Sequence, residues 1–212
     1  MRVIVTRPAG QGDALEAGLR TLGHDVVLCP LVRVEPLADD PIDVGEYDWV
    51  LVTSANGARE LARRLRGRPS RIGAIGPATA AALREHGLTA DVVARVSTQE
   101  GLLEELPRPA GRVLVAAAEG ARRLLVERLG ADFVPLYRTV ELRPVEPPSG
   151  DLALLASSSA ARSFAALALD IPAVSIGPQT TAAAREAGVE VVAEAETHDV
   201  AGLVSAVARL EP

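Results

Sequence analysis

Residues 48–57 have the sequence DWVLVTSANG, and residues 151–160 repeat its pattern as DLALLASSSA. Each segment is a short apolar run followed by a turn of small polar residues, and each leads into a helical pattern. An apolar run without alternation is typical of a strand that is buried on both faces of a parallel sheet. Strands that alternate with helices indicate βαβ units. The two stretches therefore predict an α/β fold that is built from repeated parallel-sheet units.

The internal repeat extends well beyond these two stretches. Residues 72–79 (IGAIGPAT) correspond to residues 173–180 (AVSIGPQT), and the helical patterns that follow end at Gly87 and Gly188. A second kind of unit, consisting of strand, helix and strand, occupies residues 2–31 and again residues 112–137. The two kinds of unit alternate along the chain. Five strands per domain in a flavodoxin-like winding fit this pattern.

Two extended segments suggest how the units combine into domains. Residues 30–36 (PLVRVEP) and 138–144 (RTVELRP) alternate apolar and charged residues and end at proline. If both segments cross between domains, residues 1–33 and 142–212 form a discontinuous first domain and residues 37–138 form the second. The inter-domain crossings are then residues 33–37 and 138–142. The alternative is a simple tandem of two halves with a linker at residues 107–111.

The composition excludes several classes of protein and site. No run of 18 apolar residues lacks charges, and the start of the chain has no signal-peptide pattern, so we expect a cytoplasmic protein without membrane spans. The net charge of −6 argues against general binding to nucleic acids or membranes. A single cysteine, Cys29, cannot form an internal disulfide. Together with three scattered histidines it predicts no metal site.

All 22 basic residues are arginine, which limits the chemistry that the chain can perform. Without lysine, Schiff-base catalysis and a P-loop are excluded. A bound anion would be held by arginines, hydroxyl groups and backbone amides at helix N-termini.

The turns that follow the repeated strands are the candidate binding sites. Small polar side chains there leave backbone amides free at the carboxyl edge of a parallel sheet, where ligands bind in such folds. Helix capping is the alternative explanation for the hydroxyl residues, and tight turns would need the glycines in any case. The candidate substrate-binding residues in these turns are Thr53, Ser54, Asn56, Gly76, Thr79, Ser157, Ser158, Ser159, Gly177 and Thr180.

Arginine and tyrosine side chains supply further candidates. Arg7 follows the first strand and is expected at the same edge as the turns, and Arg138 begins the second crossing. A solvated surface position is the alternative for each arginine. Tyr137 ends a strand beside that crossing, so its hydroxyl group could face a ligand in a cleft between the domains, whereas a core position is the alternative.

The order and spacing of these motifs resemble the uroporphyrinogen-III synthase family over nearly the whole chain. The residues that carry the resemblance are VTRP at 5–8, DWVLVTSANG at 48–57, IGPAT at 75–79, YRT at 137–139, SSSA at 157–160, IGP at 176–178 and GLV at 202–204. Two departures from the family pattern are Ala116-Ala117-Ala118, where an arginine is frequent, and Ala156 in place of a threonine.

The resemblance implies two flavodoxin-like domains that are joined by a two-stranded β ladder. It implies a lyase of porphyrin and heme biosynthesis that cyclises hydroxymethylbilane with loss of water. Ring D is inverted through a spiro intermediate, without metal or organic cofactor. Tyr137 falls on the cleft tyrosine of the family and is the candidate acid, and Arg7 and Arg138 are candidates to bind substrate carboxylates. The expected partner is this linear tetrapyrrole alone, bound by a monomer, and a transient contact with the preceding pathway enzyme is left open.

Two other functions compete with this interpretation. A non-catalytic two-domain sensor that closes on a small anionic ligand would share the paired domains. A hydrolase using Ser157 to Ser159 with His198 is disfavoured because the chain lacks a GxSxG elbow.

Overall fold

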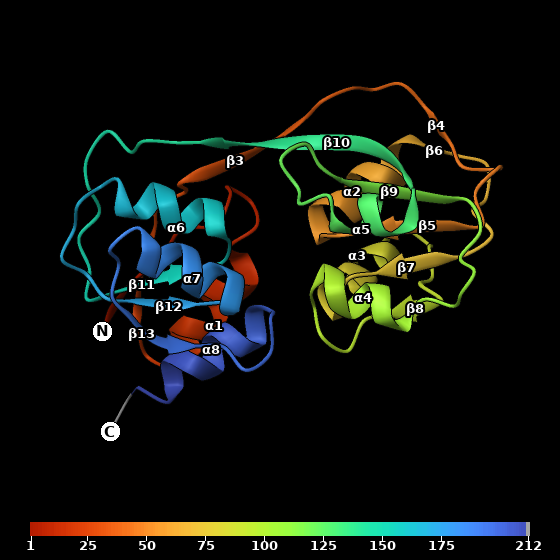
Figure 1. Cartoon of the computed structure of the whole chain (residues 1–212). Helices are drawn as coiled ribbons and strands as arrows, with labels where there is room; N and C mark the ends of the chain where they lie inside the picture. Colours follow the sequence, from red (N-terminus) through yellow and green to blue (C-terminus); the bar gives the residue numbers. More distant parts are fainter. Residues whose placement is uncertain (211–212) are drawn as a thin grey trace. The chain divides into compact units, whose positions relative to one another are not determined.

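The computed structural model describes residues 1–210, so the last two residues of the expected first domain, 211 and 212, lie outside the described residues. The chain forms two compact units. Unit 1 contains residues 1–33 and the chain from residue 139 onward, and unit 2 contains residues 34–138 (Figure 1). Each point at which the chain passes between units lies within one of the segments 33–37 and 138–142 that the sequence analysis proposed as crossings.

Unit 1 is built on a parallel five-stranded sheet. Its strands lie in the order β13-β12-β11-β1-β2, and all neighbouring pairs are parallel. When the strands are counted as they occur within the unit, the order is 2-1-3-4-5, which is the flavodoxin-like winding. The strands are β1 (Arg2–Val5), β2 (Asp25–Leu28), β11 (Leu152–Leu155), β12 (Ala173–Ser175) and β13 (Val191–Glu194).

Unit 2 has the same winding in permuted chain order. Its parallel strands lie in the order β10-β9-β5-β7-β8, so that β9 and β10 take the places of β1 and β2 of unit 1. The repeat in the sequence therefore corresponds to a repeat of topology, and the predicted α/β fold with parallel sheets is confirmed. The strands are β5 (Trp49–Val52), β7 (Ile72–Ala74), β8 (Val92–Val93), β9 (Val113–Ala118) and β10 (Asp132–Glu141).

Strand β3 (Val32–Pro36) extends this second sheet beside β10. The amide of Leu37 donates to the carbonyl of Leu136 at 3.1 Å, and the amide of Leu142 donates to the carbonyl of Leu31 at 2.9 Å. Residue numbers rise along one segment as they fall along the other, so the pairing is antiparallel. The chain passes from unit 1 to unit 2 within β3 and returns within β10.

Helices cover both faces of each sheet because successive strand residues point to opposite faces. In unit 1, α1 (Asp13–Thr21) and α8 (Val200–Ala208) pack over one face with Val3, Val5 and Leu154. On the other face, α6 (Ser158–Ala165) and α7 (Pro178–Glu186) pack over Ile4, Ala153 and Leu155.

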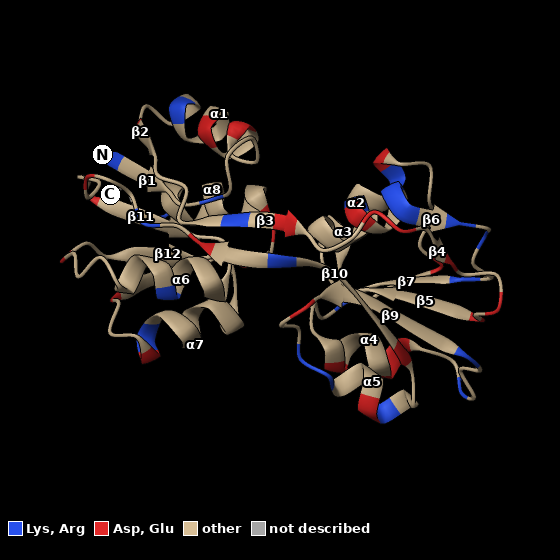
Figure 2. Ribbon diagram, turned by 90° about the horizontal axis from the view of Figure 1, so that it is seen from above, with Lys and Arg blue, Asp and Glu red and all other residues tan. Residues whose placement is uncertain are grey.

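Unit 2 repeats this arrangement. Helices α2 (Ala55–Arg64) and α3 (Pro77–Glu85) cover Val50 and Val52, whereas α4 (Gln99–Glu105) and α5 (Leu124–Leu129) cover Leu51 and Val115. Strands β11, β12, β5, β7 and β9 carry no charged residues, whereas β3 and β10 do (Figure 2). This is the burial pattern that a doubly covered parallel sheet requires.

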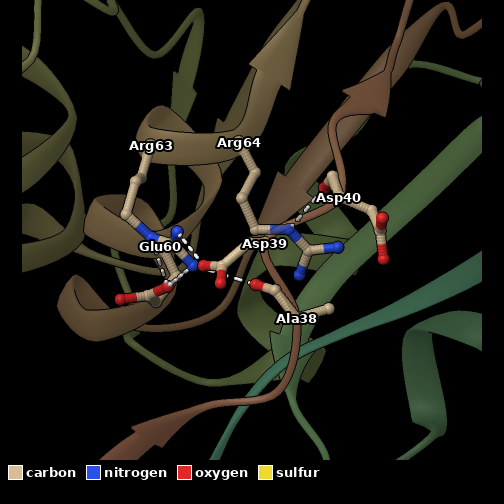
Figure 3. Close-up of polar contacts among 6 residues, drawn as sticks. All are labelled: Ala38, Asp39, Asp40, Glu60, Arg63 and Arg64. Carbon is tan, nitrogen blue, oxygen red and sulfur yellow. Dashed lines mark hydrogen bonds and ion pairs between the residues drawn. The ribbon is translucent and has the colours of Figure 1, made fainter.

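The end of α2 anchors the chain that follows β3. Figure 3 shows Arg63 and Arg64 reaching residues 38–40, just before the short pair β4 (Ile42–Asp43) and β6 (Leu65–Arg66). Arg63 binds the Asp39 carboxylate and, at 2.9 Å, the Ala38 carbonyl, and Arg64 Nε donates to the Asp40 carbonyl at 2.8 Å. Arg64 is only 7% exposed, and its Nη1 has no hydrogen-bond partner within residues 1–210.

Within residues 1–210, no helix is long and apolar enough to cross a membrane.

The buried arginine of this anchor should matter more to stability than the exposed one. We expect Arg64→Ala to lower the free energy of unfolding by about 2 kcal/mol, because it removes buried stem packing and leaves the Asp40 carbonyl without its donor. Arg63→Ala, at an exposed ion pair, should cost less although Arg63 makes more contacts. Urea denaturation of both variants measures the difference, and a larger loss for Arg63→Ala would contradict the expectation.

Candidate functional site

The winding of each sheet defines where a ligand would bind. In this strand order, the connections from two neighbouring strands leave in opposite directions, and a crevice opens at their carboxyl ends. The neighbouring strands concerned are β1 and β11 in unit 1 and β9 and β5 in unit 2. Of the thirteen sequence-predicted site residues, ten lie in the turns that follow β5, β7, β11 and β12 or in the first helical turn after them. Tyr137 and Arg138 lie in β10, and Arg7 lies two residues after the end of β1.

In unit 1, hydroxyl groups form hydrogen bonds between the segments at the carboxyl edge of the sheet. Thr6 follows β1 and is fully buried. Its hydroxyl group donates to the carbonyl of Leu154 in the neighbouring strand β11 at 2.7 Å. Ser157 caps α6 by accepting from the Ala160 amide at 3.1 Å. Ser158 donates to the Gln179 carbonyl at 3.0 Å and so ties the start of α6 to the start of α7. Arg7 and Ser159 are half-buried beside these turns.

The Gly177 turn of unit 1 lies against His198. A Cβ atom at position 177 would lie 2.8 Å from His198 Cδ2 and 3.0 Å from its Nε2, so glycine is needed for this close approach. Thr180 is 4% exposed, and its amide donates to the Gly177 carbonyl at 3.0 Å. A substrate would therefore meet the backbone of this turn rather than the Thr180 hydroxyl.

In unit 2, the edge brings together two of the predicted residues that are 83 positions apart. Ser54 caps α2 by accepting from the Gly57 amide at 2.9 Å, and the same oxygen lies 2.9 Å from the Tyr137 hydroxyl. Thr53 and Asn56 are half-buried, and the Asn56 side-chain carbonyl accepts from Arg59 at 3.1 Å. Helix capping and contact with Tyr137 therefore use the same serine.

The Gly76 turn repeats the Gly177 turn with serine in place of histidine. A Cβ atom at Gly76 would lie 2.3 Å from Ser97 Oγ, so this position also requires glycine. Thr79 is 3% exposed and, like Thr180, faces the protein interior. The cap of α4 beside this turn is Thr98, whose hydroxyl accepts from the Gly101 amide at 3.1 Å.

Burial sets the acidity of Tyr137. The side chain is 6% exposed, and burial raises the pKa of its phenol above the ordinary value, whereas the hydrogen bond to Ser54 acts in the opposite direction. The Tyr137 carbonyl accepts from the Glu119 amide at 2.8 Å, which fixes the strand at this point. The phenol therefore stays protonated at neutral pH, and its hydrogen-bond partner Ser54 is the more accessible of the two hydroxyl residues.

The arginines of unit 2 near this edge are engaged by other side chains. Nε and Nη2 of Arg138 both lie 2.9 Å from one oxygen of Glu35. Arg122 binds both carboxylate oxygens of Glu100, at 2.7 and 3.0 Å, and lowers the pKa of that carboxyl to about 2. Arg123 lies with its guanidinium 3.3 Å from the centre of the Phe133 ring. A substrate carboxylate would have to compete with Glu35 for Arg138.

Backbone amides complete the set of donors. The first amides of a helix have no acceptor within it, and they favour anions. Such amides belong to Ala55 and Asn56 in α2 and to Ser158 and Ser159 in α6, whereas Pro77 and Pro178 leave the first position of α3 and α7 without an N–H group. Both edges can therefore bind carboxylates with neutral groups. Within the described residues, no three His, Cys, Asp or Glu side chains come close enough to hold a metal ion.

The sequence pattern predicts that these residues lie at the carboxyl edges of the sheets, but it does not predict the side chains that they contact. The Ser54–Tyr137 bond, the Glu35–Arg138 pair and the contact of His198 with Gly177 join segments that are distant in sequence. The sequence offered one signal for the last of these, because the repeat aligns His198 with Ser97 and Gly177 with Gly76.

Comparison with known proteins adds an independent observation. The family model described as Uroporphyrinogen-III synthase HemD matches residues 13–205. The Uroporphyrinogen-III synthase of Synechococcus elongatus is 27% identical over 246 aligned positions, which cover 97% of this chain and 93% of that protein. The Porphyrin biosynthesis protein HemD of Ruminiclostridium josui is 30% identical over 93% of this chain, which spans 46% of that protein.

A solved structure shares the fold. The crystal structure of a mutant uroporphyrinogen III synthase from the extremely thermophilic bacterium Thermus thermophilus matches with a TM-score of 0.62 and 20% sequence identity, and the match covers 99% of this chain and 98% of that one.

The acidity of Tyr137 can be measured directly because the chain has only two tyrosines. In a Tyr47→Phe background, we expect Tyr137 to ionise above the ordinary value near 10, because burial opposes the phenolate. Adding Ser54→Ala should raise the midpoint further. As the pH rises through the ordinary value, the unfolded chain loses this proton first, so stability should fall there. Ultraviolet titration follows ionisation, and a midpoint below 10 would refute the assignment.

Proposed function

Because the chain belongs to the uroporphyrinogen-III synthase family, we propose that it cyclises hydroxymethylbilane to uroporphyrinogen III with inversion of ring D and loss of water. The match to the family model over residues 13–205 carries this proposal. The geometry supports it through two equivalent sheet edges that are lined with neutral hydrogen-bond donors. It is a lyase reaction of tetrapyrrole biosynthesis.

Substrate binding would depend on matching many carboxylates with donors in a protein of net negative charge. The linear tetrapyrrole carries eight carboxylates. We propose that the amides at the start of α2 and α6 bind some of them, together with the hydroxyl groups of Ser54, Ser157 and Ser159. Arg7 and Arg138 supply charge, and Arg138 would exchange Glu35 for a substrate carboxylate. The turns at Gly76 and Gly177 would contribute backbone rather than the buried side chains of Thr79 and Thr180.

The proton for the leaving hydroxyl group would come through the Tyr137–Ser54 pair. Ser54 Oγ already accepts from the Gly57 amide, and it can accept from Tyr137 as well. Its own proton then points away from both partners and can be donated to the departing hydroxyl group, while Tyr137 replaces it. Tyr137 is nearly buried and Ser54 is half-buried, so this relay fits their accessibility.

The remaining contribution of the protein is to hold the bilane in one folded form. Departure of the hydroxyl group as water leaves an azafulvene cation, and attack through the substituted position of ring D gives the spiro intermediate. Reopening and reclosure invert ring D, and a proton is lost at the end. Without the protein the chain closes to the uninverted isomer, so binding at fixed places accounts for the choice of product.

The test of the function is the isomer of the product. We expect the protein to convert freshly generated hydroxymethylbilane mainly to uroporphyrinogen III, whereas a heat-inactivated sample should give the uninverted isomer. Separation of the products by chromatography measures the ratio. A ratio equal to that of the spontaneous reaction would refute the synthase, and ligand-induced closure without product would favour the sensor.

The acid relay predicts a specific difference between the two tyrosines. Tyr137→Phe should lower kcat about tenfold, which is less than general acids usually contribute because a phenol is a weak acid, and should leave stability nearly unchanged. Tyr47→Phe is the matched control, because its hydroxyl group binds Asp132 at the opposite edge of the same sheet. Equal rates for both variants and the parent would remove Tyr137 from the mechanism.

The monomeric state, the cytoplasmic location and a transient contact with the preceding pathway enzyme stay predictions. Size-exclusion chromatography with light scattering measures the first of them.

A further inference from the structure

Unit 1 contains a chain of polar side chains that unit 2 lacks, with Ser175 and Thr181 buried and Glu194 exposed at its outer end. Ser175 ends β12 and is 0% exposed, and its hydroxyl oxygen lies 2.5 Å from that of Thr181 in the first turn of α7. The Thr181 hydroxyl also binds the carboxylate of Glu194, which ends β13. Ser175 and Glu194 are paired in the parallel ladder of β12 and β13. The Thr181 hydroxyl group therefore contacts side chains from the ends of two neighbouring strands.

The direction of each bond follows from the groups involved. An ionised carboxylate only accepts, so Thr181 donates its single proton to Glu194. The Thr181 oxygen can then interact with Ser175 only as an acceptor, and Ser175 donates. Each of the two hydroxyl protons is therefore used in one hydrogen bond. The bond from Thr181 to the charged carboxylate strengthens the bond from Ser175 to Thr181.

The matching positions of unit 2 show that the fold itself does not need these groups. The repeat places Ala74 opposite Ser175, Ala80 opposite Thr181 and Val93 opposite Glu194. Ala74 and Val93 pair in the same register as Ser175 and Glu194. A wholly apolar set thus supports the same strand pair and helix. The polar set of unit 1 constrains the rotation of α7 about its axis, because hydrogen bonds depend on direction more strongly than contacts between small apolar side chains do.

A second bond peculiar to unit 1 converges on the same turn. Ser158 donates to the Gln179 carbonyl, whereas the equivalent residue in unit 2 is Ala55, which has no hydroxyl group. The first turn of α7 is therefore held from α6 through Gln179 and from the sheet through Thr181. This turn also carries Gly177, whose backbone lies against His198.

We propose that Ser175, Thr181 and Glu194 are positioning residues that hold the first turn of α7 in place for the substrate. The inference rests on the proposed function, in which the Gly177 turn offers backbone groups to a substrate carboxylate. A turn that can rotate would bind the bilane less tightly and would hold ring D less firmly. The network thus makes the two units unequal, with a rigid turn in unit 1 and a looser one in unit 2.

The experiment compares the intact protein with variants of the network. Thr181→Val keeps the shape and removes the hydroxyl group, and Thr181→Ser restores the hydroxyl. The combined Ser175→Ala, Thr181→Ala and Glu194→Val variant reproduces the apolar set of unit 2 and leaves no buried hydroxyl unpaired. Ser163→Ala is the matched control, because Ser163 is a buried serine of unit 1 whose hydroxyl has no partner within residues 1–210.

Three measurements are made on each folded variant: steady-state kinetics, the ratio of product isomers, and hydrogen–deuterium exchange. In Thr181→Val and in the combined variant, we expect KM for hydroxymethylbilane to rise about fivefold with kcat changed less than about twofold. The share of uninverted product should rise as well. Hydrogen–deuterium exchange of the peptide that contains residues 177–184 should become faster. Thr181→Ser and Ser163→Ala should behave as the parent in all three measurements.

The outcomes separate this proposal from the proposed function. If the parent protein makes uroporphyrinogen III and the variants match it in KM, product ratio and exchange, the network has no positioning role and the synthase stands. If the parent gives only the spontaneous ratio, the synthase and the catalytic role of the network both fall, and exchange alone shows whether the bonds hold the turn. Faster exchange with unchanged KM and product ratio would also overturn the proposal.

Discussion

In a parallel sheet every strand runs in the same direction, so every connection must return across a face of the sheet before the next strand begins. All turns from strand to helix therefore gather at one edge, and all helix N-termini point toward it. The two units of this protein apply that constraint twice. It explains why residues 53–57, 76–79, 157–159 and 177–180, which are spread over more than half of the chain, occupy equivalent positions at two sheet edges.

The same constraint allows the permuted order of the chain. Because β9 and β10 complete the sheet of unit 2 as β1 and β2 complete that of unit 1, the order of segments can change while the edge is preserved. The passage through β10 also places Tyr137 next to the end of β9, within reach of Ser54 at the end of β5. The connection between the units and the candidate acid thus belong to one strand.

The two edges share a scaffold but differ in how they are held and charged. Unit 1 fixes its turns with hydroxyl groups, at Thr6, Ser158 and Thr181. Unit 2 has alanine at the corresponding positions 116, 55 and 80, and it instead carries the Tyr137–Ser54 pair. Under the proposed function, the edge of unit 2 supplies the proton and the edge of unit 1 binds carboxylates of the substrate.

Local periodicity and the equivalence between segments are enough to predict the fold class, the repeat, the family and the sheet edges that carry the candidate residues. What each side chain contacts there depends on the folded chain. Thr79 and Thr180 turn inward, Arg138 is bound by Glu35, and Tyr137 reaches Ser54. Such pairings join segments that are distant along the chain, and they depend on helix rotation and packing. A local pattern of residues does not contain that information.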